Sequence, residues 1–231
     1  MRAAVYSATR NLYADMMPSI KSLIKNSNVE KIYLLLEDDE IGYWLPEICE
    51  VVNVSGQKWF SPGGPNYGSS WSYMVLLRAV YHRIFPCLDR IFSIDVDTIV
   101  DKDISHLWDV DLSDYFLMGV RETTSLATPE YPYRNAGVMM LNLDLLRKSG
   151  RGDDVAKALR NRRWAYPEQD AFNAVCGCAV LDLPREYNAG KGTLPYGEPI
   201  IRHWMGEHDI WLDDPLVEKY RSMSWEEVLK R

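Results

Sequence analysis

The 231-residue sequence is poor in cysteine and has no excess of basic residues, and both absences exclude classes of protein. Its four cysteines form no C-x-x-C pair, and Cys176 and Cys178 stand in the apolar stretch AVCGCAV, which favours small buried side chains. The sequence therefore predicts a reduced, cytoplasmic protein rather than a disulfide-stabilised one. The 26 Lys and Arg residues are outnumbered by 33 Asp and Glu, and the formal net charge is −7. This charge argues against a nucleic-acid-binding protein, which would need a basic face.

Long apolar runs are also missing. No segment approaches the roughly 18 apolar residues that suggest a membrane span, and residues 1–17 lack the apolar stretch of a signal peptide. We therefore expect no strong membrane anchor. Aromatic residues, in contrast, are plentiful: 8 Trp and 14 Tyr are more than a core of this size demands. Some of them are expected to line a surface that binds a flat polar group, such as a sugar ring or a base.

Short apolar runs alternate with segments of helical period, which predicts an α/β fold with a mostly parallel central sheet and helices on both faces. Strands are expected at residues 3–7, 32–36, 51–54, 90–94, 115–119, 138–143, 179–183 and 200–204. Helices are expected at 14–26, 72–84, 154–163 and 169–175, and an S-x-x-E capping box at Ser224 opens a last one. Residues 55–70 are rich in Gly, Pro, Ser and Asn, so they form a long loop of the functional kind, with Trp59 and Trp71 expected to border a cleft.

The segment IFSIDVDTIV carries the most informative acidic pair. Asp95 and Asp97 follow an apolar strand, and ligands bind at the carboxyl ends of strands in open α/β sheets. Two carboxylates that point the same way favour a hard divalent cation such as Mg²⁺ or Mn²⁺. The pair alone also fits a helix cap or a solvated strand end. A third interpretation is the D-x-D-x-T motif of haloacid-dehalogenase-like phosphohydrolases, with Asp213 and Asp214 as the later acidic pair.

Six segments in a fixed order resemble glycosyltransferase family 8, the relatives of glycogenin and of lipopolysaccharide galactosyl- and glucosyltransferases. They are VYSATRNLYA (5–14), IFSIDVD (91–97), YRNAGVMMLNLDLLR (133–147), YPEQDAFN (166–173), LPREYN (183–188) and HWMGEHDIW (203–211). Arg78 precedes the first Asp of the pair by 17 residues, where this family carries a helix arginine. The resemblance extends from residue 2 to Trp211.

This resemblance implies a GT-A fold and a hexosyltransferase that uses a nucleotide-sugar donor, usually a UDP-sugar, with retention at the anomeric carbon. The acceptor would be a carbohydrate or glycoconjugate. Asp95, Asp97 and His203 would ligate Mn²⁺ or Mg²⁺. We expect one GT-A-like domain over 1–231, in which 1–100 is the nucleotide-binding half ending in the D-x-D motif. Residues 101–231 would be the donor-sugar and acceptor half with a short C-terminal helix.

The resemblance also implies further site residues. Glu168 would bond hydroxyls of the donor sugar, and Gln169 would lie near the anomeric centre. The residues implied in donor binding are Ser7, Thr9, Tyr13, Arg78, Val96, Asn135, Ala136 and Gly206. Other interpretations stay open: the Asn-Ala-Gly sequence also fits a turn, and carboxylates in a first helical turn are favoured by the helix dipole.

Several positions depart from the family pattern. Asp209 stands where the family carries a diphosphate-binding lysine, and Lys191, Arg202 and Arg10 are candidate substitutes. A lysine at position 209 is accordingly expected to tighten the binding of UDP and metal. Glu122 and Glu168 stand where Asp is usual. A non-catalytic nucleotide-sugar-binding relative is therefore a further interpretation. The sequence does not indicate the donor sugar, the acceptor or the oligomeric state.

Overall fold

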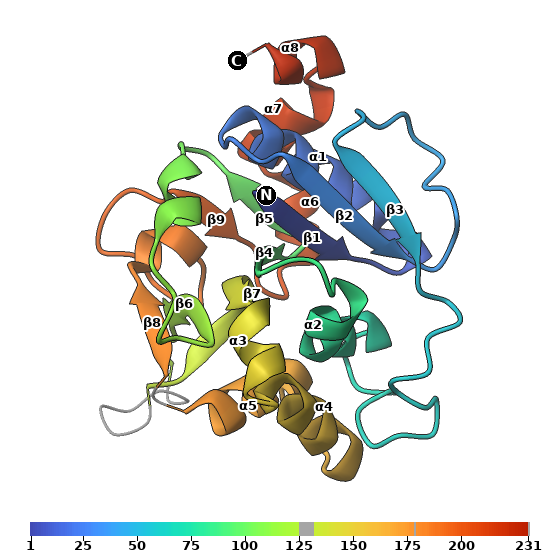
Figure 1. The fold of residues 1–231 in the computed structure, drawn as a ribbon. Coiled ribbons are helices and arrows are strands. Elements are labelled where there is room, and N and C mark those ends of the chain that lie inside the picture. The colour runs from blue at the N-terminus through green and yellow to red at the C-terminus, as the bar shows by residue number, and fades with distance from the viewer. Residues whose placement is uncertain (125–131, 178, 231) are drawn as a thin grey trace.

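The structure is a computed structural model that describes residues 1–124, 132–177 and 179–230 (Figure 1). Cys178, one of the two cysteines predicted to be buried, lies outside the described residues. The strands are β1 (Ala3–Ser7), β2 (Lys31–Leu36), β3 (Cys49–Asn53), β4 (Arg90–Ile94), β5 (Thr98–Val100), β6 (Leu117–Arg121), β7 (Arg134–Asn142), β8 (Val180–Leu183) and β9 (Ile201–His203). The α-helices are α1 (Tyr13–Lys25), α2 (Tyr81–Ile84), α3 (Leu143–Lys148), α4 (Arg151–Asn161), α5 (Pro167–Cys176), α6 (His208–Asp213), α7 (Pro215–Ser222) and α8 (Trp225–Leu229). The 3₁₀ helices are η1 (Arg10–Leu12), η2 (Tyr73–Val80), η3 (Ser105–Asp109) and η4 (Arg185–Asn188).

Seven strands form one sheet in the order β3-β2-β1-β4-β7-β6-β8. Within it β7 is antiparallel to both neighbours, and the other pairings are parallel, so the prediction of a mostly parallel sheet is confirmed. The short strands β5 and β9 pair separately and antiparallel, with Thr98 opposite His203. This small sheet brings the segment after β4 beside the segment before α6.

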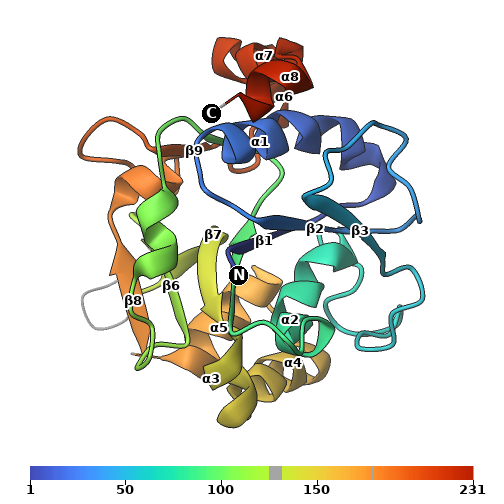
Figure 2. The same ribbon diagram turned by 45° about the horizontal axis from the view of Figure 1, so that its top comes forward.

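Both faces of the large sheet are covered, as the alternation of side chains in β1 shows. Ala4 and Tyr6 are buried in the cluster that contains the apolar side of α1. Ala3 and Val5 point the other way, into the cluster formed with η2, α4 and α5. Figure 2 shows α1, α7 and α8 above the sheet and α2 to α5 below it. The prediction of helices on both faces is therefore also confirmed.

Several predicted elements differ in detail. The expected helix at 72–84 is mostly the 3₁₀ helix η2, with a single α-helical turn after it. Asn135 and Ala136, which precede the strand expected at 138–143, lie inside β7, which begins four residues earlier than predicted. The last helix begins where expected, because Ser224 and Glu227 form the reciprocal capping box. The helix α7 was not predicted, although Asp214 caps it and Pro215 is its first residue, a standard start signal.

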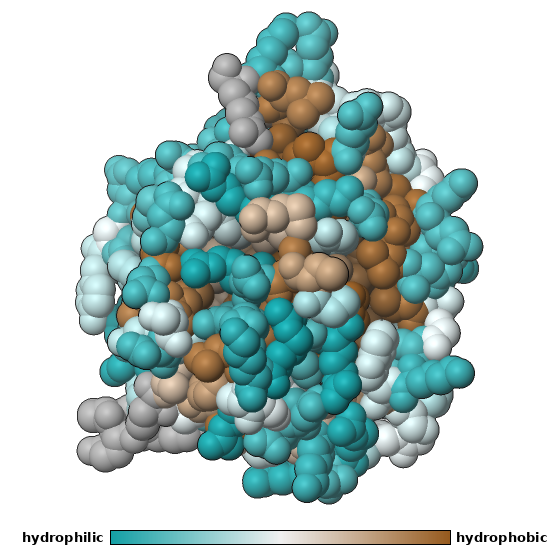
Figure 3. All heavy atoms as spheres, viewed as in Figure 1, coloured by the Kyte–Doolittle hydropathy of each residue, from teal (hydrophilic) through white to brown (hydrophobic). Residues whose placement is uncertain are grey.

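The surface is largely polar on the face in view. Figure 3 shows hydrophilic side chains over most of it, with hydrophobic groups gathered on the β3 side and below α8. Among the described residues, no helix combines the length and the apolar character that a membrane crossing requires.

Candidate active site

A cavity of about 1150 Å³ opens at the carboxyl ends of β1 and β4. Segments far apart in the sequence contribute to its wall. They include Ser7 and Thr9, Trp71 and Ser72, Asp95 to Asp97, Asn135 to Gly137, Pro167 to Gln169, and His203 with Met205 and Gly206. This is the position where open α/β sheets bind ligands.

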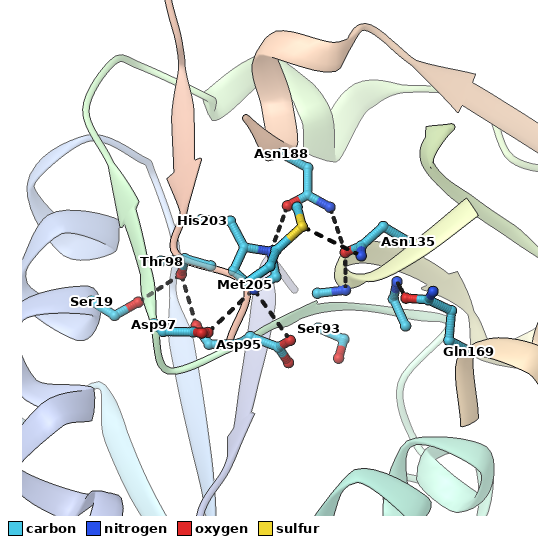
Figure 4. Close-up of polar contacts among 12 residues, drawn as sticks. Ser19, Ser93, Asp95, Asp97, Thr98, Asn135, Gln169, Asn188, His203 and Met205 are labelled. Atoms are coloured by element: carbon cyan, nitrogen blue, oxygen red, sulfur yellow. Dashed lines mark hydrogen bonds and ion pairs between the residues drawn. The ribbon is translucent and has the colours of Figure 1, made fainter. Parts of the chain in front are cut away.

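Asp95, Asp97 and His203 converge at the floor of this cavity (Figure 4). One ligand atom from each lies within 4.8 Å of the others. His203 Nε2 is 3.2 Å from Asp97 Oδ1 and 3.7 Å from Asp95 Oδ2. The β5–β9 pairing causes this convergence, because it sets Thr98 opposite His203 and lets Trp204 N–H donate to the Asp97 carbonyl at 3.0 Å.

His203 is fixed by a second layer of polar groups. Its Nδ1 is 2.8 Å from Asn188 Oδ1, and Asn188 Nδ2 donates to Asn135 Oδ1 at 2.8 Å. Asn188 and His203 are both buried. Because Asn188 Oδ1 can only accept, His203 Nδ1 carries a proton and Nε2 faces the two carboxylates.

The three side chains fit a divalent metal ion. Cis ligands of an octahedral ion with bonds near 2.1 Å lie about 3 Å apart, and the His203 to Asp97 and Asp95 separations are close to this. The hydrogen bond from Nδ1 to Asn188 orients the ring, as in protein metal sites. Burial lowers the pKa of His203, but attraction to Asp97 and Asp95 outweighs burial, so its pKa is raised. The site therefore favours positive charge.

Gly137 forms the backbone under this cluster. A Cβ atom at this position would lie 2.1 Å from His203 Cε1 and 2.9 Å from Asp95 Oδ2. Gly137 O accepts from Asp95 N at 2.8 Å, and Gly137 N donates to Asn135 Oδ1 at 2.9 Å. The backbone of β7 thus approaches the carboxylate and the imidazole as closely as only glycine permits.

Arg78 lies behind the cavity wall and joins two acidic residues. The buried guanidinium donates to Asp95 Oδ1 at 2.5 Å, to Glu168 Oε1 at 2.9 Å and to Ser93 Oγ at 2.9 Å. Burial opposes its charge, but Asp95 and Glu168 outweigh burial and raise the pKa of Arg78. Burial also raises the pKa of Glu168 to about 7, against the lowering effect of Arg78. Arg78 does not line the cavity, but it contacts Asp95 and Glu168, which do.

Gln169 and Glu168 stand in the first turn of α5 and both line the cavity. Gln169 Oε1 accepts from the backbone N–H of Ala136 at 2.8 Å, and its Nε2 donates to Tyr133 Oη at 3.2 Å. These bonds tie α5 to β7 across the cavity wall. Asn135 is held similarly, because its Nδ2 donates to Glu122 Oε1 at 2.8 Å.

Only some of the residues implied in nucleotide binding line the cavity. Ser7, Thr9, Val96 and Gly206 line the cavity. Tyr13 is buried outside the lining, where its hydroxyl accepts from Glu37 N at 2.9 Å. It positions the loop after β2 rather than facing the cavity.

Other sequence expectations are met unevenly. In the loop expected to border a cleft, Trp71 lines the cavity, whereas Trp59 packs against the core. Asp209 is exposed in the first turn of α6 and lies outside the cavity lining. Arg10, a candidate substitute for the family lysine, pairs with Asp38.

Three residues that matter in the site were not singled out from the sequence. Gly137 carried a weak signal as the glycine of an Asn-Ala-Gly run, and Asn188 ended the LPREYN segment. Met205, whose sulfur is 3.7 Å from Asn135 Nδ2, lies within the HWMGEHDIW segment.

Known proteins share this fold. The solved structure of an active-site mutant of LgtC has a TM-score of 0.76 with 16% identity, covering 98% of this chain and 100% of that one. LgtC in complex with donor and acceptor sugar analogues has a TM-score of 0.73 with 17% identity, covering 94% and 93% of the two chains. The prediction of a GT-A fold is confirmed by these likenesses.

Sequence comparison gives the family. Glycosyltransferase GlyA of Streptococcus pneumoniae is 24% identical over 97% of this chain and 34% of its own length. General stress protein A of Bacillus subtilis is 26% identical over 59% of this chain and 60% of its own length. The chain therefore spans less than two thirds of the length of these curated relatives. The family model described as "Glycosyl transferase family 8" matches residues 5–214, and the chain belongs to glycosyltransferase family 8.

Proposed function

We propose that the protein is a metal-dependent, retaining hexosyltransferase that uses a nucleotide-sugar, with a UDP-sugar as the expected donor. The acceptor class is a carbohydrate or glycoconjugate. The observation that carries the proposal is the convergence of Asp95, Asp97 and His203 on one point at the floor of the cavity. These side chains come from segments more than 100 residues apart, and a shared cation gives a reason for their meeting.

Asp95, Asp97 and His203 would hold Mn²⁺ or Mg²⁺ through two carboxylate oxygens and an imidazole nitrogen. When bound, the ion would supply positive charge to the donor diphosphate. Because His203 Nδ1 faces Asn188 Oδ1, Nε2 would be the nitrogen that binds the ion. Gly206, in a left-handed turn with φ of 65°, would leave the backbone beside the site accessible to a phosphate.

The transferred hexose would lie against α5 and β7. Glu168 would accept hydrogen bonds from its hydroxyls, while Gln169, held by Ala136 and Tyr133, would lie near the anomeric carbon. In the reaction, an acceptor hydroxyl oxygen bonds to the anomeric carbon as the bond from that carbon to the diphosphate breaks. The hydroxyl proton passes to the departing diphosphate on the same face, so that configuration is retained.

Two further expectations remain proposals. Residues 1–100 would bind the nucleotide and 101–231 the sugar and acceptor, and both halves contribute strands to the one seven-stranded sheet. A reducing, cytoplasmic location is supported by Cys49, Cys87 and Cys176, which are free thiols.

The phosphohydrolase alternative finds no support in the site. Asp214 accepts from Leu216 N at 2.8 Å as the cap of α7, and neither Asp213 nor Asp214 lines the cavity. The non-catalytic alternative differs from our proposal only in turnover, so turnover must be measured.

The test is a panel of nucleotide-sugars incubated with the protein and Mn²⁺ or with EDTA, followed by measurement of released nucleoside diphosphate. We expect slow, metal-dependent hydrolysis of one UDP-sugar, and NMR of the early product should show the retained anomer. Stabilisation by UDP and Mn²⁺ without hydrolysis or transfer would indicate the non-catalytic alternative.

A matched pair of variants links the activity to the site. Asp97→Asn removes one carboxylate of the cluster, and Asp154→Asn removes an exposed carboxylate on α4 with the same change in net charge. We expect only Asp97→Asn to abolish Mn²⁺-dependent turnover. Equal activity of both variants would refute the assignment of the metal site.

A further inference from the structure

The cavity wall is strongly acidic. Its described lining contains six carboxylates, from Asp15, Glu37, Asp95, Asp97, Glu122 and Glu168. Among the described lining residues, Lys191 is the only lysine or arginine. A diphosphate carries several negative charges, and such a wall repels it unless cations stand between them. Arg78 is not available for this purpose, because its guanidinium is buried and bonded to three protein groups.

The backbone around Lys191 is fixed against the site. A Cβ atom on Gly190 would lie 2.3 Å from His203 O, and one on Gly192 would lie 2.8 Å from Glu122 Oε2. Thr193, fully buried, donates its backbone N–H to Gly190 O at 3.0 Å. The two glycines therefore let the chain pass directly over β9 and beside Glu122, with Lys191 between them.

The side chain of Lys191 is mostly exposed and lies near one carboxylate. It is 58% exposed, and its Nζ lies 3.8 Å from Glu207 Oε1. An exposed ion pair of this length is weak. Nζ is also 4.0 Å from the position that a Cβ on Gly206 would occupy. Lys191 thus reaches from its own loop to the turn that follows His203, at the edge of the candidate metal site.

We propose that Lys191 is the side-chain cation that binds the diphosphate of the donor, and that Glu207 is its partner when no nucleotide is bound. The inference rests on the proposed function, since it takes a nucleoside diphosphate as the ligand. A lysine ammonium is a compact charge suited to phosphate oxygens. On binding, Nζ would exchange the weak pair with Glu207 for a charge-assisted hydrogen bond to phosphate.

The test is calorimetric titration of UDP into the protein at saturating Mn²⁺. Lys191→Gln should weaken UDP binding roughly tenfold or more, the scale of one hydrogen bond to a charged group. Lys191→Arg should retain most of the affinity, and Glu207→Gln should tighten binding because the competing carboxylate is gone. Lys157→Gln, on the exposed side of α4, is the matched control for net charge and should bind UDP as the wild type does.

A second readout separates the phosphate role from a structural one. The affinity of the wild type for UDP should fall with added KCl more steeply than that of Lys191→Gln, because the variant has lost an exposed charge contact. The midpoint of thermal unfolding without ligand should be the same in both, because the Lys191 side chain is exposed. Mn²⁺ binding, followed by electron paramagnetic resonance, should not weaken in the variant.

The two failures are distinguishable. If the wild type with Mn²⁺ does not bind UDP, the proposed function fails. If the wild type binds UDP and Lys191→Gln binds it equally well with the same dependence on KCl, the proposed function stands and the assignment of Lys191 is overturned.

Discussion

The backbone of β7 at Gly137 sets the geometry of the candidate metal site, and a single methyl group should test this. In Gly137→Ala the new Cβ would lie 2.1 Å from His203 Cε1, 2.6 Å from Nδ1 and 2.9 Å from Asp95 Oδ2. Carbon atoms in contact are roughly 3.5–4.0 Å apart, so the ring must retreat by about 1.4 Å or β7 must shift. Neither is easy, because His203 is buried and its Nδ1 is bonded to Asn188.

The expected magnitude follows from this displacement. Overpacking of a filled interior typically costs about 1–3 kcal/mol of unfolding free energy. Binding sites need their ligand atoms placed within about 0.5 Å, and a shift almost three times larger should lower Mn²⁺ affinity by at least the roughly 10–100-fold seen when supporting groups are lost. The assays are chemical denaturation and calorimetric titration of Mn²⁺.

The control is Gly119→Ala on β6, whose residue 119 pairs with Met139 of β7. Its Cβ would meet Met139 Cγ at 3.6 Å, Leu117 Cδ1 at 3.7 Å and Arg134 Cβ at 3.8 Å, which are ordinary contacts. We expect Mn²⁺ affinity close to that of the wild type. Adding His203→Ala to Gly137→Ala should restore part of the lost stability, because it removes the ring that the methyl group strikes. Equal stability and equal Mn²⁺ affinity in Gly137→Ala and Gly119→Ala would refute the reasoning.

Three further predictions concern the surroundings of the site and the core. Asn188→Ala should weaken Mn²⁺ binding about 10–100-fold in a calorimetric titration, because His203 Nδ1 loses the hydrogen bond that orients the ring. Unchanged affinity would show that packing alone holds the ring. Asp209→Lys should leave UDP affinity nearly unchanged, because Asp209 is exposed and outside the cavity lining. This differs from the tighter binding expected from the sequence. A strong gain in affinity on titration with UDP and Mn²⁺ would show that α6 turns toward the phosphates. Burial lowers the pKa of His82 below 6.5, although Asp153 opposes this shift. Below pH 6.5 the unfolded state therefore binds a proton more readily than the folded state does, and the free energy of unfolding should fall. Urea unfolding between about pH 5 and 7.5 should show a smaller fall in His82→Gln, and identical profiles would contradict the assignment.

The strands β1, β2 and β4 could be predicted from sequence because they are buried on both faces. Such strands read as continuous apolar runs, and the residues on both faces of β1 are indeed buried. The strand β7 was predicted too short at its start. Arg134 and Asn135 are polar residues at its first positions, and the apolar pattern begins only after them. Their hydrogen bonds to Asp182 and Glu122 replace the apolar packing that the pattern requires.

The candidate metal cluster could be anticipated only in part. Asp95 and Asp97 follow from position, since they end an apolar strand at the edge of the sheet where ligands bind. His203 does not, because it reaches them through β5 and β9, two strands of three residues each. Strands of three residues are too short to show the alternation of apolar and polar residues that marks a strand. The prediction of His203 therefore rests on resemblance to the family rather than on a sequence pattern.

The charge of the cavity is a property of the fold and has no counterpart in the linear sequence. Its six carboxylates come from five separate segments, and only the segment with Asp95 and Asp97 is marked as a site by its own composition. Lys191 stands in a Gly-Lys-Gly run, and the sequence offers it only as one of three candidate substitutes for the family lysine. Only the packing of the two glycines against His203 and Glu122 gives that lysine its position. A chain with a net charge of −7 can therefore bind a diphosphate if a metal ion and one well-placed ammonium offset the acidic wall locally. The loss of UDP affinity in Lys191→Gln measures how much of the favourable charge around the diphosphate comes from this side chain rather than from the metal ion.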